Sequence, residues 1–246
     1  MRVFRLSVGN ETRYATEAGD EFEILNGHPF GELTPTGRVV SCREVRVLPP
    51  VTPNKIIGVG ANFPGDTGPS DLVPSVFLMP PTALIGPGAR AKIPAEFGSI
   101  LAEGELGVVI GKQISKTAKL VPGSAILGYT CVNDFSLRDS SLDYVPPLIK
   151  KGADSMVAVG PCIHLGNLVD DASIQTFCGS ERVQEGLVSQ MKFSVDAVIT
   201  FLTRYITLEP GDLISMGTPV PKPRLLRGAR VAVEIDGIGR LENSIE

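Results

Sequence analysis

Short stretches in which apolar and polar residues alternate are the dominant pattern of this chain. Within residues 1 to 48, the segments RVFRLSV, TRYAT and REVRVL alternate in this way between turns that contain glycine and asparagine, which is typical of β-strands. Residues 49–54, PPVTPN, hold three prolines and cannot continue the hydrogen bonding of a sheet. We therefore predict a small β-rich N-terminal domain over residues 1–50 and a main domain over residues 51–246.

The main domain is predicted to be mainly β with some α. Apolar runs bounded by glycine or proline predict strands within residues 55–63, 74–88, 104–112 and 124–134. Helical spacing of apolar residues is clearest within residues 191–212, where Val195, Val198, Ile199 and Leu202 precede a stop at EPGD. Asp236-Gly237, between two alternating runs, predicts a hairpin near the end of the chain.

Composition narrows the class of protein. The 246 residues are 43% hydrophobic, which is enough to form a substantial core. No apolar run reaches the length of a membrane helix, and the N-terminus lacks the apolar stretch of a signal peptide. Four cysteines lie far apart without a CxxC pair, and the net charge is −4 without a basic block. We expect a cytoplasmic protein that binds neither nucleic acid nor membrane.

Two familiar kinds of site are excluded by their motifs. The glycines of GVGANFPG (58–65) do not have GxGxxG spacing, and Pro64 interrupts the place where a phosphate-binding helix would begin. No GxSxG motif is present, and the two histidines, His28 and His164, lie in segments typical of ordinary turn or strand residues. Neither a dinucleotide site nor a Ser-His-Asp site is therefore predicted.

Three carboxylates instead predict a metal site. Glu103 and Glu105 enter an apolar strand two positions apart, so their side chains project from the same face. Asp134 comes at the end of another apolar strand. Carboxylates placed side by side repel each other unless a cation lies between them, and a set of oxygen ligands suits Mg²⁺ or Mn²⁺.

Basic and hydroxyl side chains follow these strands. Lys150 and Lys151 precede Gly152, and a lysine beside a metal-bound oxo acid can neutralise a developing enolate. Which of the two lysines faces the site stays open. Arg138 is a candidate substrate contact and a candidate ion-pair partner of Asp139. Thr218, in the motif MGTP, is a candidate ligand for a substrate carboxylate.

The motifs KIIGVGANF, AEGELGVVIGK, GYTCVNDFSLRD, KKGADS, LEPGDLISMGTP and GIGRLENSI follow one another in the order seen in the fumarylacetoacetate hydrolase family. The resemblance covers residues 54 to 246 nearly continuously. It implies a mixed β-roll catalytic domain behind the N-terminal cap, a homodimer, and Mg²⁺, Mn²⁺ or sometimes Ca²⁺ as the ion. The implied substrates are small oxo acids or their enols, which react by carbon–carbon hydrolysis, decarboxylation or enol–keto isomerisation through a stabilised enolate.

The resemblance also implies roles for single residues. Glu103, Glu105 and Asp134 would hold the ion. Lys151 would contact the ion's water or the substrate's oxygen. Thr218 would help bind the substrate carboxylate.

One segment differs from the family pattern. Hydrolytic and decarboxylating members often have NYxxHxxE after the first strand of the domain, whereas this chain reads NFPGDTGPSDLVPS, and PVPKP replaces the family's GVG after GTP. Because no histidine is present, we expect the proton carrier to be Asp66, Asp71 or water. Two other readings stay open: a non-catalytic or repurposed member that binds a metal and an organic acid, and a β-rich binding module without a metal.

Overall fold

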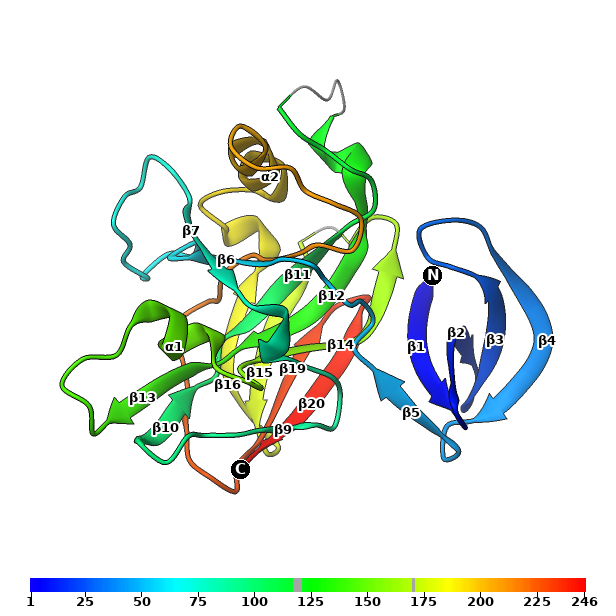
Figure 1. Cartoon of the computed structure of the whole chain (residues 1–246), viewed down its shortest axis with the longest axis horizontal. Helices are drawn as coiled ribbons and strands as arrows, with labels where there is room; N and C mark the ends of the chain where they lie inside the picture. Colours follow the sequence, from blue (N-terminus) through cyan, green and yellow to red (C-terminus); the bar gives the residue numbers. More distant parts are fainter. Residues whose placement is uncertain (117–120, 170) are drawn as a thin grey trace.

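The computed structural model describes residues 1–116, 121–169 and 171–246. These residues form three β-sheets and two α-helices, with three short 3-10 helices at Pro81–Ala83, Pro122–Ala125 and Val188–Gln190 (Figure 1). The predicted class, mainly β with some α and a small β-rich N-terminal part, is confirmed. Neither α-helix among the described residues has the length and apolar character that crossing a membrane requires.

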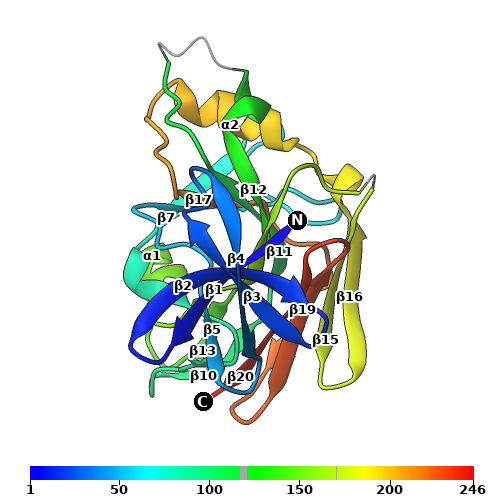
Figure 2. The ribbon, with the colours of Figure 1, turned by 90° about the vertical axis from the view of Figure 1, so that its right-hand side faces the viewer.

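The N-terminal strands lie to one side of the molecule (Figures 1 and 2). They are β1 (Arg2–Val8), β2 (Glu11–Ala18), β3 (Glu21–Gly27), β4 (Leu33–Ser41) and β5 (Val45–Leu48). Successive strands from β1 to β4 pair antiparallel, and β5 pairs with β1. The first residues of β1 also pair with β14, so hydrogen bonding continues from this part of the chain into the main sheet.

The main sheet continues through strands that are far apart in the sequence. In spatial order they are β14 (Val157–Leu165), β12 (Ile126–Asp134), β11 (Gly104–Ile110), β17 (Leu213–Ser215), β6 (Ile56–Gly60) and β7 (Ser75–Met79), with β8 (Leu84–Ile85) on β14. Every residue of β11 is buried. Because β11 is central and buried, residues at its start are held in a fixed place.

Two smaller sheets complete the fold. The first contains β16 (Glu181–Leu187), β15 (Ser173–Cys178), β19 (Arg230–Ile235), β20 (Gly239–Ile245) and β9 (Arg90–Ala91), and it packs against β11, β12 and β14. The second contains β13 (Ser136–Ser140), β10 (Phe97–Leu101) and β18 (Arg224–Leu225). The helices are α1 (Pro147–Gly152), beside β7 and β13, and α2 (Val195–Thr203).

One local prediction needed correction, and two strands were not predicted. The helix predicted within residues 191–212 ends at Thr203 instead of at EPGD, because the chain turns and Leu208 then pairs with Ile114 as a β-bridge. The sequence pattern also did not indicate β3 and β4; β4 contains Pro35 and is mostly exposed, as an edge strand allows. The predicted hairpin is confirmed, since β19 and β20 pair across Asp236-Gly237.

Candidate functional site

Three buried carboxylates meet where β11 begins and β12 ends. Glu103 precedes β11, Glu105 lies within it, and Asp134 is the last residue of β12. The side chains are almost inaccessible, since the residues are 5%, 2% and 1% exposed. One oxygen from each lies within 4.8 Å of the others. The structure thus brings together the three acids that the sequence pattern selected.

Hydroxyl and backbone donors hold two of these acids in place. Ser136 donates its hydroxyl to Glu103 Oε1 at 2.5 Å, and Ser215 donates to Glu105 Oε2 at 2.6 Å. The backbone N–H of Gly217 donates to the same Glu105 oxygen at 2.7 Å. Gly217 has φ +88°, and an added Cβ would approach Val59 O to 2.8 Å, so glycine is required for this contact.

The third acid retains a free oxygen. Asp134 Oδ2 accepts a hydrogen bond from Lys151 Nζ at 2.7 Å, whereas Oδ1 is buried and has no hydrogen-bond partner in the described structure. A buried carboxylate oxygen without a donor is costly. It is readily explained as an oxygen reserved for a ligand.

The electrostatics of the cluster agree with this interpretation. Burial, with the nearby charge of Asp134, raises the pKa of Glu105 to about 8. Burial, with the charge of Glu103, raises the pKa of Asp134 to about 6. For Glu103, Lys151 and Lys222 outweigh the effect of burial and lower the pKa. Ionising Glu105 and Asp134 is therefore unfavourable in the metal-free site, and a bound cation would offset that cost.

A hard divalent ion fits this cluster. Three carboxylates supply oxygen ligands, and ligands of one Mg²⁺ or Mn²⁺ ion at about 2.1 Å from it lie roughly 3–4 Å apart, within the spacing of this cluster. Asp134 Oδ1 accepts no hydrogen bond, so its lone pairs are free to bind such an ion. Glu103, Glu105 and Asp134 are the residues that could hold it.

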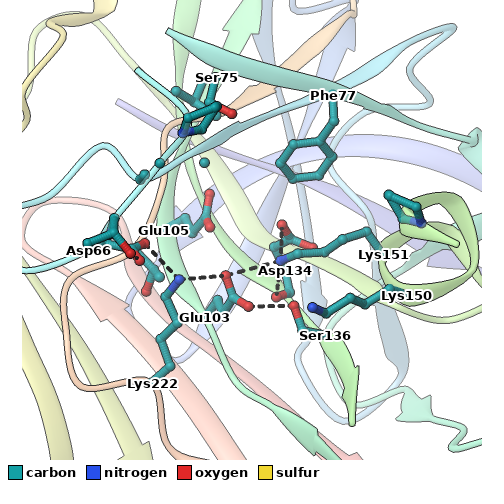
Figure 3. A pocket seen from close by; sticks show the side chains of 18 of the residues that line it. Asp66, Ser75, Phe77, Glu103, Glu105, Asp134, Ser136, Lys150, Lys151 and Lys222 are labelled. Carbon is teal, nitrogen blue, oxygen red and sulfur yellow. Dashed lines mark hydrogen bonds and ion pairs between the residues drawn. The ribbon is translucent and has the colours of Figure 1, made fainter. Parts of the chain in front are cut away.

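Lys151, not Lys150, reaches the acids. Its Nζ lies 3.0 Å from Glu103 Oε2 and 2.7 Å from Asp134 Oδ2 (Figure 3). Burial lowers its pKa, but the charges of Asp134 and Glu103 outweigh burial and raise it, so the ammonium stays charged. The pKa of Lys150 is lowered by burial and by the nearby Arg138 and Lys151.

A cavity of about 590 Å³ opens over the acids. Arg138 and Thr218, the two substrate contacts expected from the sequence, both line it, and so does Lys150. The Thr218 hydroxyl donates to Gly104 O at 2.9 Å and accepts from Gln184, so it must give up the first bond to donate to a substrate. The alternative role of Arg138, an ion pair with Asp139, is not formed among the described residues: Asp139 pairs with Arg224 and accepts a hydrogen bond from Ser99.

The two candidate proton carriers differ in position. Asp66 lines the cavity, and its carboxylate is 2.7 Å from Lys222 Nζ. Asp71 has a side chain that is 81% exposed, pairs with Lys192 and is not among the residues that line the cavity. Asp66 is therefore the better placed of the two.

Sequence reasoning missed several residues of the site. Ser136 and Ser215 bind the acids, Phe77 lies with its ring centroid 5.6 Å from Lys151 Nζ, and Lys222 joins Asp66 at the cavity. Ser136 lies two residues after Asp134 in NDFSLRD, and Lys222 lies in PVPKP, the segment that differs from the family pattern. The position of these two residues within those motifs was the signal in the sequence that could have identified them.

Comparison with known proteins connects this geometry to a family. The model of the fumarylacetoacetate hydrolase C-terminal domain matches residues 55–246, and that of the Rv2993c-like N-terminal domain matches residues 1–50. Protein Rv2993c of Mycobacterium tuberculosis is 33% identical, covering 100% of this chain and 98% of its own length.

Solved structures agree with the sequence comparisons. A 5-carboxymethyl-2-hydroxymuconate delta-isomerase from Mycobacterium smegmatis superposes with a TM-score of 0.89 at 30% identity, covering 100% of this chain and 99% of that one. A maleylpyruvate hydrolase from Sphingobium sp. SYK-6, solved with manganese(II) and pyruvate, shares the fold, with a TM-score of 0.81 at 23% identity over 100% and 98% of the two chains. The chain therefore belongs to the fumarylacetoacetate hydrolase family of enzymes, with an Rv2993c-like domain at its N-terminal end.

Proposed function

We propose that this chain is a Mg²⁺- or Mn²⁺-dependent enzyme that interconverts keto and enol forms of a small oxo acid. The observation that carries the proposal is Asp134 Oδ1, a buried oxygen without a hydrogen-bond donor on one of three clustered carboxylates, beside a charged lysine. Such a cluster supports binding a chelating anion through an ion, and the lysine supports stabilising an enolate.

The residues of the site can divide the reaction between them. A bound divalent ion would supply Lewis-acid polarisation of the substrate carbonyl. Asp66, at the cavity, would take the proton from the carbon next to that carbonyl. The electron pair of the C–H bond then forms a carbon–carbon double bond, and the π electrons of the carbonyl move to its oxygen. The ammonium of Lys151 would neutralise the negative charge on that oxygen, and transfer of the proton to the oxygen gives the enol; the reverse steps return the keto form.

The charges around the cavity favour a substrate with a second acidic group. Four acidic and four basic side chains line it: Asp66, Glu103, Glu105, Asp134, Arg138, Lys150, Lys151 and Lys222. With a divalent ion bound, two positive charges remain uncompensated. Arg138 and Lys150 have no ion-pair partner among the described residues, so we assign them to the far carboxylate of an oxo diacid.

The relatives support isomerisation ahead of hydrolysis. The superposed M. smegmatis protein is an isomerase by name, and an Escherichia coli relative, 30% identical over 96% of this chain and 57% of its own length, is named as a bifunctional isomerase/decarboxylase. The segment from Asn62 to Ser75 contains no histidine that could activate a water for hydrolysis.

Exchange of solvent deuterium into a panel of oxo acids tests the proposal. The panel contains oxaloacetate, an acylpyruvate and other 2-oxo diacids, each with Mg²⁺ or Mn²⁺ and with a chelator. We expect metal-dependent exchange by the wild type, loss of exchange in Glu103→Ala, and retention in Glu96→Ala, which removes an exposed acid outside the cavity lining. Metal binding without exchange or turnover of any member of the panel would refute the proposal.

A second candidate is a repurposed member that binds the metal and an organic acid without turnover. The absence of a histidine between Asn62 and Ser75 is the observation that favours it. Calorimetry that detects Mn²⁺ and oxalate binding, together with a failed exchange assay, would support this candidate. The homodimer implied by the family, which sedimentation velocity can measure, and the cytoplasmic location stay predictions.

A further inference from the structure

Lys222 occupies a position in the site that the assigned roles do not explain. Its Nζ lies 2.7 Å from Asp66 Oδ2 and 3.8 Å from Glu103 Oε2, and its side chain is 23% exposed. Figure 3 shows Glu103 between Lys222 and Lys151, which approach it from opposite sides. Lys222 therefore connects a candidate metal ligand with the candidate proton carrier.

Asp66 lies in the loop between β6 and β7, residues 61–74. A second lysine contacts this loop at a different place. Lys192 Nζ lies 3.0 Å from Asp71 Oδ1 and 3.2 Å from the backbone carbonyl of Asp66. Unlike Lys222, Lys192 is not among the residues that line the cavity. Lys222 thus binds the loop inside the cavity and Lys192 binds it outside the cavity. Only Lys222 contacts the Asp66 carboxylate.

Electrostatic repulsion explains why the inner lysine matters for Asp66. The cavity already contains the three acids of the cluster, and an unneutralised fourth carboxylate would be driven toward solvent. The ammonium of Lys222 offsets that repulsion and restricts the Asp66 side chain to one orientation. The backbone N–H of Thr67 donates to Asp66 Oδ1 at 3.1 Å and further limits its rotation.

We propose that Lys222 is a positioning residue that holds the Asp66 carboxylate in the cavity, where it can reach the substrate's carbon. This inference rests on the proposed function for its catalytic consequence. The claim that Lys222 positions Asp66 depends only on the ion pair between them. If Lys222 only stabilised the fold, replacing it should affect the reaction no more than replacing Lys192, which contacts the same loop.

The experiment compares Lys222→Met, Lys222→Arg and Lys192→Met in the deuterium-exchange assay with saturating Mn²⁺. We expect Lys222→Met to lower kcat about 100-fold, the scale of a misplaced catalytic group, with KM and the Mn²⁺ Kd changed by less than about threefold. Lys222→Arg should recover most of the loss, and Lys192→Met should stay within about threefold of the wild type. In Asp66→Asn/Lys222→Met, exchange should be no slower than in Asp66→Asn, because the two residues act through one interaction.

Crystal structures of the same variants supply a readout that does not depend on turnover. Asp66 should leave the cavity in Lys222→Met and stay in place in Lys192→Met. An Asp66 carboxylate that keeps its position in Lys222→Met, equal losses in the two lysine variants, or additive losses in the double variant would overturn the inference. Loss of Mn²⁺ binding in Lys222→Met would also overturn it, by assigning Lys222 to the metal site. Absence of exchange in the wild type would refute the proposed function and, with it, the catalytic consequence of the ion pair.

Discussion

Binding of Mn²⁺ by this protein should weaken steeply as the pH falls. Burial and the charge of Asp134 raise the pKa of Glu105 to about 8, and burial and the charge of Glu103 raise the pKa of Asp134 to about 6. A carboxylate binds a cation in its ionised form, so the ion must displace the protons that these two acids hold. Acidification is therefore the perturbation that tests the assignment of the metal site.

The magnitude follows from the two pKa values. An acid with a pKa of about 8 is roughly three-quarters ionised at about pH 8.5 and about 1% ionised at about pH 6. An acid with a pKa of about 6 goes from fully to half ionised over the same interval. Together these changes predict that the apparent affinity falls about 150-fold, or ~3 kcal/mol.

The same shifts determine the sign for folding. In the unfolded chain the two carboxyls have ordinary pKa values, 4.5 for Glu105 and 3.8 for Asp134. Because the folded, metal-free protein holds these protons to a higher pH, its stability should fall as the pH rises from about 4 to about 8. Mn²⁺ should reverse that fall. Thermal unfolding with and without the ion measures both effects.

Calorimetry is the assay for the affinity. Titrations with Mn²⁺ in two buffers of different ionisation enthalpy count the protons released, and we expect about one per ion at about pH 7, mostly from Glu105. Glu105→Gln should bind weakly and lose most of the pH dependence. Equal affinity at about pH 6 and about pH 8.5, with no proton release, would refute the reasoning.

Three further substitutions test the support of the site. Asn62→Ala removes three hydrogen bonds, two with the backbone of Phe193 just before α2 and one with the carbonyl of Met216. Urea denaturation should therefore measure a loss of ~2–3 kcal/mol in the free energy of unfolding; an unchanged value would contradict this. Gly104→Ala adds a methyl group that overlaps the Thr176 hydroxyl between two sheets, so it should cost ~1–3 kcal/mol in the same measurement and weaken Mn²⁺ binding. Ser215→Ala removes the hydroxyl donor of Glu105 and should raise the pKa of Glu105 further, so calorimetry should find Mn²⁺ binding about tenfold weaker near pH 7 and nearly normal at high pH; equal weakening at every pH would argue against this cause.

Features that depend on neighbouring residues were predictable from the sequence. The convergence of Glu103 and Glu105 follows from the two-residue period of a strand, and the hairpin at Asp236-Gly237 follows from its turn residues. The end of α2 was not predictable in this way, because it depends on the pairing of Leu208 with Ile114 from a distant part of the chain. Tertiary contacts of this kind leave no local pattern.

The residues that contact the acids could not be predicted from the sequence for the same reason. Lys222 lies 156 residues from Asp66, and Ser215 lies 110 residues from Glu105. Each is an ordinary residue of its own segment, and only the folded sheet makes it a partner. The resemblance to the family could not supply Lys222 either, because PVPKP is a segment in which this chain differs from the family pattern.

The two adjacent lysines of α1 illustrate how the fold resolves what the sequence left open. Successive residues of a helix point about 100° apart, so only one of the pair can face the acids. Lys151 does so and neutralises Glu103 and Asp134, while Lys150 lines the cavity near Arg138. A divalent ion on the acids would take over that neutralisation and leave the Lys151 ammonium available to a substrate oxygen. Under the proposed function, the same turn of helix would serve the reacting end of an oxo diacid through Lys151 and its far carboxylate through Lys150.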